Sequence, residues 1–155
     1  MIFAAQNQKL FTSEASQDGY LGKSFAESFP LNILIAEDNI VNQKLIERIL
    51  HKLGYHTETA SDGIQVLSSI AKKEYNVILM DIRMPEMDGL EATREIRQMA
   101  IKQPYIIAMT ANAMSNDREE CLDNGMNDYL AKPLSTDEII NSLKKGSAHI
   151  CTKNT

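Results

Sequence analysis

Glu37 and Asp38 follow directly after one apolar run of this chain, and Asp81 follows directly after another. Thr110 and Lys132 hold the same kind of position further on, at the ends of two more runs. Carboxylates that lie close together need a cation, and hard oxygen ligands suit Mg²⁺, which completes its shell with waters and phosphate oxygens. Lys132 would add a positive charge for phosphate oxygens, and Thr110 a hydroxyl donor. These residues predict a site for a phosphoryl group beside a divalent ion, with Asp81 as the nucleophile.

Five strands must bring these side chains together, and the apolar or alternating runs predict them at Leu31–Ala36, Tyr55–Ala60, Val77–Met80, Tyr105–Met109 and Asp128–Ala131. A helical segment follows each strand. This alternation predicts one α/β domain, in which a doubly wound, five-stranded parallel sheet carries helices on both faces. In the flavodoxin-like order 2-1-3-4-5, strands one and three are neighbours at the point where the strand order reverses. The carboxylates that follow these two strands would therefore converge.

The helical segments carry start and stop signals that support this division. The expected starts are an Asn39 cap, an Asp62-Gly63 start, and capping-box pairs at Asp88 with Glu91 and at Ser135 with Glu138. Leu45, Ile46 and Leu50 are spaced as part of one apolar face, and Gly54 is expected to end that helix. The weakest helix is predicted at about Ser115–Asn124. The last helix is expected to end at Lys144–Gly146.

The remaining segments predict the domain limits. Residues 1–30 are polar, hold neither a strand nor a helix period for long, and indicate a linker or flexible arm. Residues 31–146 are predicted to form the domain, and residues 147–155 a short polar tail.

Composition excludes several classes of function. The chain has 155 residues, 43% of them hydrophobic and 24% charged, with a formal net charge of −5. An acidic chain without a basic run is a poor candidate for binding nucleic acid or an anionic membrane. No apolar stretch is long enough to span a bilayer, and the first residues lack a secretory signal, so a cytoplasmic location is expected. Cys121 and Cys151 lack CxxC spacing and are expected to be reduced, non-catalytic thiols.

Each site residue also has an ordinary structural explanation when it is taken alone. Asp81 and Thr110 could cap turns, Glu37 and Asp38 could begin a helix, and Lys132 could be a surface charge. Residues of these types at four strand ends together favour the phosphoryl site.

The motifs resemble those of the receiver domains of two-component response regulators, over about residues 31–146. The matching segments are Glu37-Asp38-Asn39, Met80-Asp81-Ile82-Arg83-Met84-Pro85 with Asp88-Gly89, Thr110-Ala111 and Lys132-Pro133. The forms at residues 36–39 and 109–113 look most like receivers attached to hybrid sensor histidine kinases.

This resemblance implies roles that the residues alone do not give. Asp81 would accept phosphate from a phosphohistidine, while Asp38 binds Mg²⁺ directly and Glu37 helps directly or through water. The backbone carbonyl of Arg83 would complete the metal site, with Mn²⁺ as a substitute ion. Thr110 and Tyr129 match the family's switch pair, although Tyr129 is alternatively a buried core residue.

The implied partner is a histidine kinase or a histidine phosphotransfer domain, with no nucleic acid and no membrane contact. A homodimer through the fourth helix, fifth strand and fifth helix is a further expectation. The chain would catalyse its own phosphorylation and dephosphorylation, either free-standing or as part of a hybrid kinase.

Two rival functions remain open at this point. A phosphatase of the haloacid dehalogenase type also forms an aspartyl phosphate. The motif after the first strand of that family resembles Asp-x-Asp, whereas Asp38 is followed here by Asn39 and Ile40. An interaction domain with a degenerate site is disfavoured, because every motif position is filled.

Overall fold

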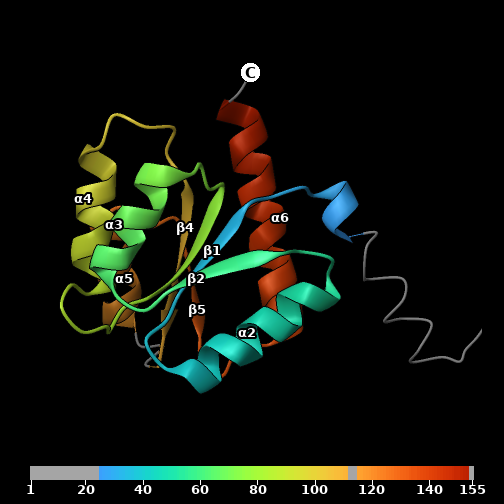
Figure 1. Ribbon diagram of the computed structural model, residues 1–155, viewed down its shortest axis with the longest axis horizontal. Coiled ribbons are helices and arrows are strands. Elements are labelled where there is room, and N and C mark those ends of the chain that lie inside the picture. The colour runs from blue at the N-terminus through green and yellow to red at the C-terminus, as the bar shows by residue number, and fades with distance from the viewer. Residues whose placement is uncertain (1–24, 112–114, 154–155) are drawn as a thin grey trace, which may run out of the picture.

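The structure is a computed structural model that describes residues 25–111 and 115–153. In this part of the chain one parallel sheet contains β1 (Ile33–Ala36), β2 (Thr57–Ala60), β3 (Val77–Asp81), β4 (Tyr105–Thr110) and β5 (Asp128–Ala131). The strand order is β2-β1-β3-β4-β5, so the predicted fold class is confirmed (Figure 1). Every strand agrees with its predicted range to within two residues at either end.

The labelled helices alternate with these strands and are α2 (Ile40–Lys52), α3 (Gly63–Lys72), α4 (Gly89–Gln98), α5 (Ser115–Asp123) and α6 (Thr136–Lys153). The predicted caps are confirmed by hydrogen bonds from backbone amides to the side chains of Asn39, Asp62, Asp88 and Ser135. Each bond satisfies an amide that the first turn of a helix leaves without an intrahelical partner.

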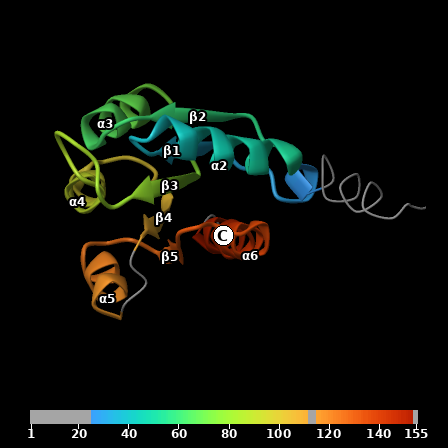
Figure 2. The ribbon, with the colours of Figure 1, turned by 90° about the horizontal axis from the view of Figure 1, so that it is seen from below.

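Two apolar layers enclose the sheet. One layer lies between the sheet and helices α2 and α6 and contains Ile35, Leu50 and Ile107. The other lies between the sheet and helices α3, α4 and α5 and contains Ile78 and Ile96. Figure 2 shows these two groups of helices on either side of the strands. β1, β3 and β4 are buried along their whole length, as expected for strands covered on both faces.

Leu45 does not lie on the inward face of α2, so its predicted place in the apolar stripe is wrong. Its side chain is 46% exposed, whereas Ile46, Leu50 and Leu53 are buried. These three side chains follow one another at intervals of three or four residues and already fill the inward stripe. Leu45 is turned about 100° away from Ile46 around the helix axis.

The predicted end of the last helix at Gly146 is also wrong, because α6 continues to Lys153. Gly146 is a site of close packing: a Cβ atom there would lie 2.9 Å from Cδ2 of Tyr105. One turn later the ring of His149 packs on the same Tyr105 ring, with 5.3 Å between centroids. Ile150 packs against the core layer beside α2 and α6. These contacts hold residues 147–153 in a helix, so the predicted tail is helical as far as Lys153.

Residues 25–29 of the predicted arm pack on the domain. Residues 25–28 are helical, Phe25 is 7% exposed, and its ring lies 5.0 Å from Phe29 and 6.1 Å from Tyr55 between centroids. The Ala26 amide donates to the Leu53 carbonyl at 3.0 Å, and the Tyr55 hydroxyl donates to the Phe29 carbonyl at 2.6 Å. The rest of the arm lies outside the described residues, and its flexibility stays a prediction. Among the described helices, none is long and apolar enough to cross a membrane.

Candidate functional site

The carboxylates of Glu37, Asp38 and Asp81 meet at the edge of the sheet where the strands end. β1 and β3 are adjacent, and Ala36 pairs with Met80, so Glu37 and Asp81 leave the sheet side by side. One oxygen from each carboxylate lies within 4.8 Å of the other two. Within the residues that the structure describes, no other group of three acidic, histidine or cysteine side chains converges in this way.

Lys132 reaches this cluster from the end of β5. Its backbone amide donates to the Thr110 carbonyl at 2.7 Å, which fixes the start of the loop after β5. Its Nζ lies 2.9 Å from Glu37 Oε1 and 3.3 Å from Asp81 Oδ2. Three strands therefore supply the side chains of one charged cluster.

The pKa of Asp81 is raised to about 6, first by burial and then by the negative charge of Glu37, while Lys132 opposes the rise. Burial also raises the pKa of Glu37, but the hydrogen bonds from Lys132 and the Asn39 amide outweigh it and leave that pKa lowered. Burial disfavours the charged form of Lys132, yet the hydrogen bond to Glu37 and the charge of Asp81 leave its pKa raised. Glu37 and Lys132 thus form a charged pair, and ionisation of Asp81 is less favoured than that of Glu37.

The loop after β3 shapes the approach to Asp81. The Arg83 amide donates to Asp81 Oδ1 at 3.3 Å, and the Arg83 side chain is exposed. A cavity of about 600 Å³ opens beside it and is lined by Asp38, Ile82, Arg83, Met84, Pro85, Asp88, Leu90 and Glu120. The cluster thus borders a space large enough for a small phosphorylated group.

Two further residues shape this edge and were missed by the sequence reasoning as site residues. The Gln43 side-chain amide donates to the Glu37 carbonyl and is buried. A Cβ atom at Gly89 would collide with the Asp81 carbonyl oxygen, so only glycine lets α4 begin this close to the strand end. The Asp88-Gly89 motif was a signal for Gly89, whereas no sequence pattern pointed to Gln43.

Thr110 and Tyr129 lie on neighbouring strands on one face of the sheet, because Ala108, two residues before Thr110, pairs with Tyr129. Thr110 is buried, and its hydroxyl donates to Asp117 Oδ2 at 3.3 Å. Tyr129 is half-buried, and the Arg118 guanidinium lies 5.4 Å from its ring centroid. Both side chains of the predicted switch pair therefore contact α5.

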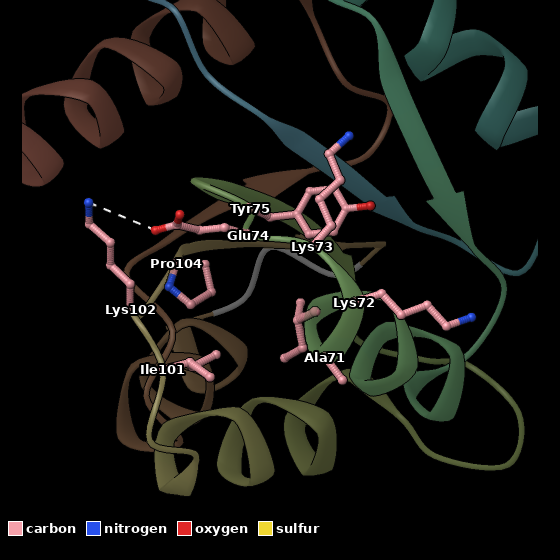
Figure 3. Close-up of a pocket in the computed structure, with 9 residues that line it drawn as sticks. Ala71, Lys72, Lys73, Glu74, Tyr75, Ile101, Lys102 and Pro104 are labelled. Atoms are coloured by element: carbon pink, nitrogen blue, oxygen red, sulfur yellow. Dashed lines mark ion pairs between the residues drawn. The ribbon is translucent and has the colours of Figure 1, made fainter.

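A second cavity, of about 310 Å³, lies where α3 leads into β3 and α4 into β4 (Figure 3). Ile101 and Pro104 contribute apolar lining, and Figure 3 shows Lys102 and Glu74 on its rim. Their ion pair spans 3.8 Å and is more than half exposed, which makes it weak. The converging carboxylates, and not this cavity, mark the candidate functional site.

Residues 33–144 match the family model described as response regulator receiver domain. This match covers most of the chain and includes the whole carboxylate cluster with Lys132. The chain belongs to the receiver domain family. The resemblance predicted from the motifs is thereby confirmed.

Relatives of this receiver domain include hybrid kinases. It is 46% identical over 122 residues to the hybrid signal transduction histidine kinase H of Dictyostelium discoideum, covering 76% of this chain. It is 36% identical over 121 residues to the sensor histidine kinase RcsC of Escherichia coli, covering 78% of this chain. The receiver domain spans only 9% and 13% of the lengths of these two proteins.

Solved structures show the same fold. The receiver domain of a Pseudomonas aeruginosa sensor histidine kinase, crystallised with a magnesium ion coordinated in its active-site cleft, is 48% identical, with a TM-score of 0.71 over 76% of this chain and 98% of that one. A Saccharomyces cerevisiae response regulator receiver domain, crystallised with a histidine phosphotransfer protein, is 26% identical, with a TM-score of 0.71 over 76% of this chain and 89% of that one. The cluster of Glu37, Asp38 and Asp81 fits Mg²⁺, because it offers hard carboxylate oxygens at one point.

Proposed function

We propose that Asp81 accepts a phosphoryl group from a phosphohistidine and that Asp38, Glu37, Asp81 and the Arg83 carbonyl hold Mg²⁺ beside it. The observation that carries this proposal is the position of Lys132, whose Nζ lies 3.3 Å from Asp81 Oδ2 in a cluster of two buried carboxylates and one exposed carboxylate. The magnesium-bound receiver domain from Pseudomonas aeruginosa supports the choice of ion. Mn²⁺ is proposed as a substitute, because it accepts the same oxygen ligands.

The chemistry assigned to the protein residues is positioning and charge neutralisation. An Asp81 carboxylate oxygen attacks phosphorus, the bond from phosphorus to the histidine nitrogen breaks, and that nitrogen keeps the electron pair. Lys132 stabilises the phosphoryl oxygens as a point charge, and the Thr110 hydroxyl donates a hydrogen bond to one of them. A bound Mg²⁺ would neutralise charge on the transferred group. The same site then hydrolyses the aspartyl phosphate slowly.

We propose that the phosphodonor protein docks on the apolar surface beside the site, formed by Ile40, Val41, Leu45 and Ile64. These side chains are 46 to 75% exposed, on the outer face of α2 and the start of α3. Ile40 and Val41 lie in the first turn of α2, directly after the Asn39 cap that follows Asp38 in the chain, and Ile64 lies in the first turn of α3, after the Asp62 cap. The donor is a histidine kinase or a phosphotransfer protein, as the receiver domain crystallised with such a protein suggests.

Labelling at Asp81 tests this function. Incubation with acetyl phosphate and Mg²⁺ should add one phosphoryl mass, located at Asp81 by peptide mass spectrometry, and EDTA should prevent it. Asp81→Asn should keep the fold and lose the label, whereas the exposed Asp123→Asn should label normally. Undiminished labelling of Asp81→Asn would rule out Asp81 as the acceptor. Turnover of small phosphate esters would instead favour a phosphatase of the haloacid dehalogenase type. Complete absence of labelling would favour an interaction domain with a degenerate site.

The wider setting is part of the same proposal. The chain acts in the cytoplasm and, when phosphorylated, forms a homodimer through the surface of α5, β5 and α6. Sedimentation with and without beryllium fluoride would test the dimer, and fractionation of cells would test the location. We also propose that residues 31–146 form the receiver domain, with Phe25 and Ile150 of the flanking segments packed on its core.

A further inference from the structure

We propose that Asp117 is a positioning residue that holds the Thr110 hydroxyl and so ties α5 to the site until Asp81 is phosphorylated. This inference rests on the proposed function and deepens it by adding a residue that lies outside the carboxylate cluster. It assigns α5 a definite resting contact and a definite event that breaks this contact.

Two acceptors, Asp117 and a phosphoryl group on Asp81, would compete for the Thr110 hydroxyl. Thr110 is the last residue of β4, and Met109 before it pairs with Asp81 of β3, so the backbone of Thr110 lies next to the end of the acceptor strand. Its Oγ1 donates to Asp117 Oδ2 in the first turn of α5 at 3.3 Å. A hydroxyl has one proton to donate, and a carboxylate and a phosphoryl group are both strong acceptors. A phosphoryl group on Asp81 therefore competes with Asp117 for that proton.

The opposite end of α5 is fixed to α4. Arg94 donates to the Asn124 side chain at 2.6 Å, and Arg97 donates to the Gly125 carbonyl at 2.8 Å and to Asn127 Oδ1 at 2.7 Å. These bonds hold the segment that follows the last turn of the helix. When Asp117 is released, α5 therefore swings about its C-terminal end, and the Arg118 contact with Tyr129 changes with it.

Binding of beryllium fluoride, used with Mg²⁺ as a phosphoryl mimic, tests the competition. Its dissociation constant would be measured by amide chemical shifts on the whole chain. Asp117→Ala should bind the mimic roughly 3- to 10-fold more tightly, the factor expected when one competing hydrogen bond is lost. Asp117→Asn keeps an acceptor, but an uncharged and weaker one, and its affinity should lie between those of the wild type and Asp117→Ala. Glu119→Ala removes an exposed charge from the same helix and should change nothing.

Two further results decide the outcome. In a Thr110→Ala background, Asp117→Ala should add no effect, because the donor is gone; an additive effect overturns the inference. Equal affinities for the wild type and Asp117→Ala overturn it, and so does an Asp117→Asn that behaves like Asp117→Ala, which would show charge repulsion alone.

Hydrogen exchange should be faster at residues 117–119 in Asp117→Ala and unchanged at residues 124–127. If the wild type is labelled at Asp81 but the variants give these contrary results, this inference fails while the proposed function stands. If the wild type is not labelled, the proposed function itself fails.

Discussion

The pKa of Asp81 is set by opposite influences, and this balance is the physical argument for the proposed cation beside it. Burial and the charge of Glu37 raise its pKa to about 6, while Lys132 acts in the other direction. One lysine faces two buried carboxylates, and Asp38 adds a third, exposed one. The cluster has an excess of negative charge that Mg²⁺ would neutralise.

Asp38→Ala should separate stability from metal binding. Removal of one carboxylate from the cluster should leave the free energy of unfolding in EDTA unchanged or slightly higher, because repulsion is relieved. The affinity for Mg²⁺ should fall at least about tenfold, since a direct ligand is lost. Urea unfolding and magnesium titration would measure both, with the exposed Asp123→Ala as a control. Unchanged Mg²⁺ affinity would show that Asp38 is not a ligand.

The two cysteines should differ in reactivity. Cys121 is buried, and burial followed by the charges of Asp117 and Glu120 raises the pKa of its thiol to about 11. Cys151 is exposed. Because the thiolate is the reactive form, iodoacetamide at pH 8 should modify Cys151 and leave Cys121 intact until the protein is unfolded. Mass spectrometry of native and urea-unfolded samples checks this, and equal native rates at both thiols would contradict it.

At the scale of elements, a substitution on the exposed face of α2 should affect docking of a protein donor without affecting the phosphate chemistry at Asp81. Val41 is 75% exposed, so Val41→Glu should fold normally. It should slow phosphotransfer from a protein donor by roughly tenfold or more, because it places a charge in an apolar interface. Labelling by acetyl phosphate, which needs no docking surface, is the internal control. Equal slowing with both donors would mean that the variant damages the site, and no slowing would remove the α2 surface from the proposal.

At the scale of the whole molecule, residues before the first strand complete the core. Phe25 packs with Phe29 and Tyr55, so Phe25→Ala should lower the free energy of unfolding by about 2–4 kcal/mol through lost burial and a cavity. Glu27→Ala, an exposed position in the same turn, should stay within about 0.5 kcal/mol of the wild type. Urea unfolding would measure both variants. A small effect at Phe25 would mean that this turn detaches without cost.

The sequence by itself determined the strands, the helix caps and the site residues that follow strand ends. These features depend on local signals: buried strands need continuous apolar runs, caps need short polar side chains, and ligands follow the strands of such sheets. Asn39, Asp62 and Asp81 could be placed for this reason. The strand order then brought Glu37 beside Asp81, because one topology suits this pattern.

Only the tertiary structure decided contacts between segments far apart in the chain. Gly146 and the lysines before it are local stop signals, but packing of Tyr105 on Gly146 and His149 keeps α6 helical beyond them. Phe25 lies in a polar segment, and its burial depends on Tyr55, 30 residues later. The hydrogen bond from Thr110 to Asp117 depends on where α5 lies against β4. Local signals end within a few residues, whereas these choices are made by the close packing of the folded core.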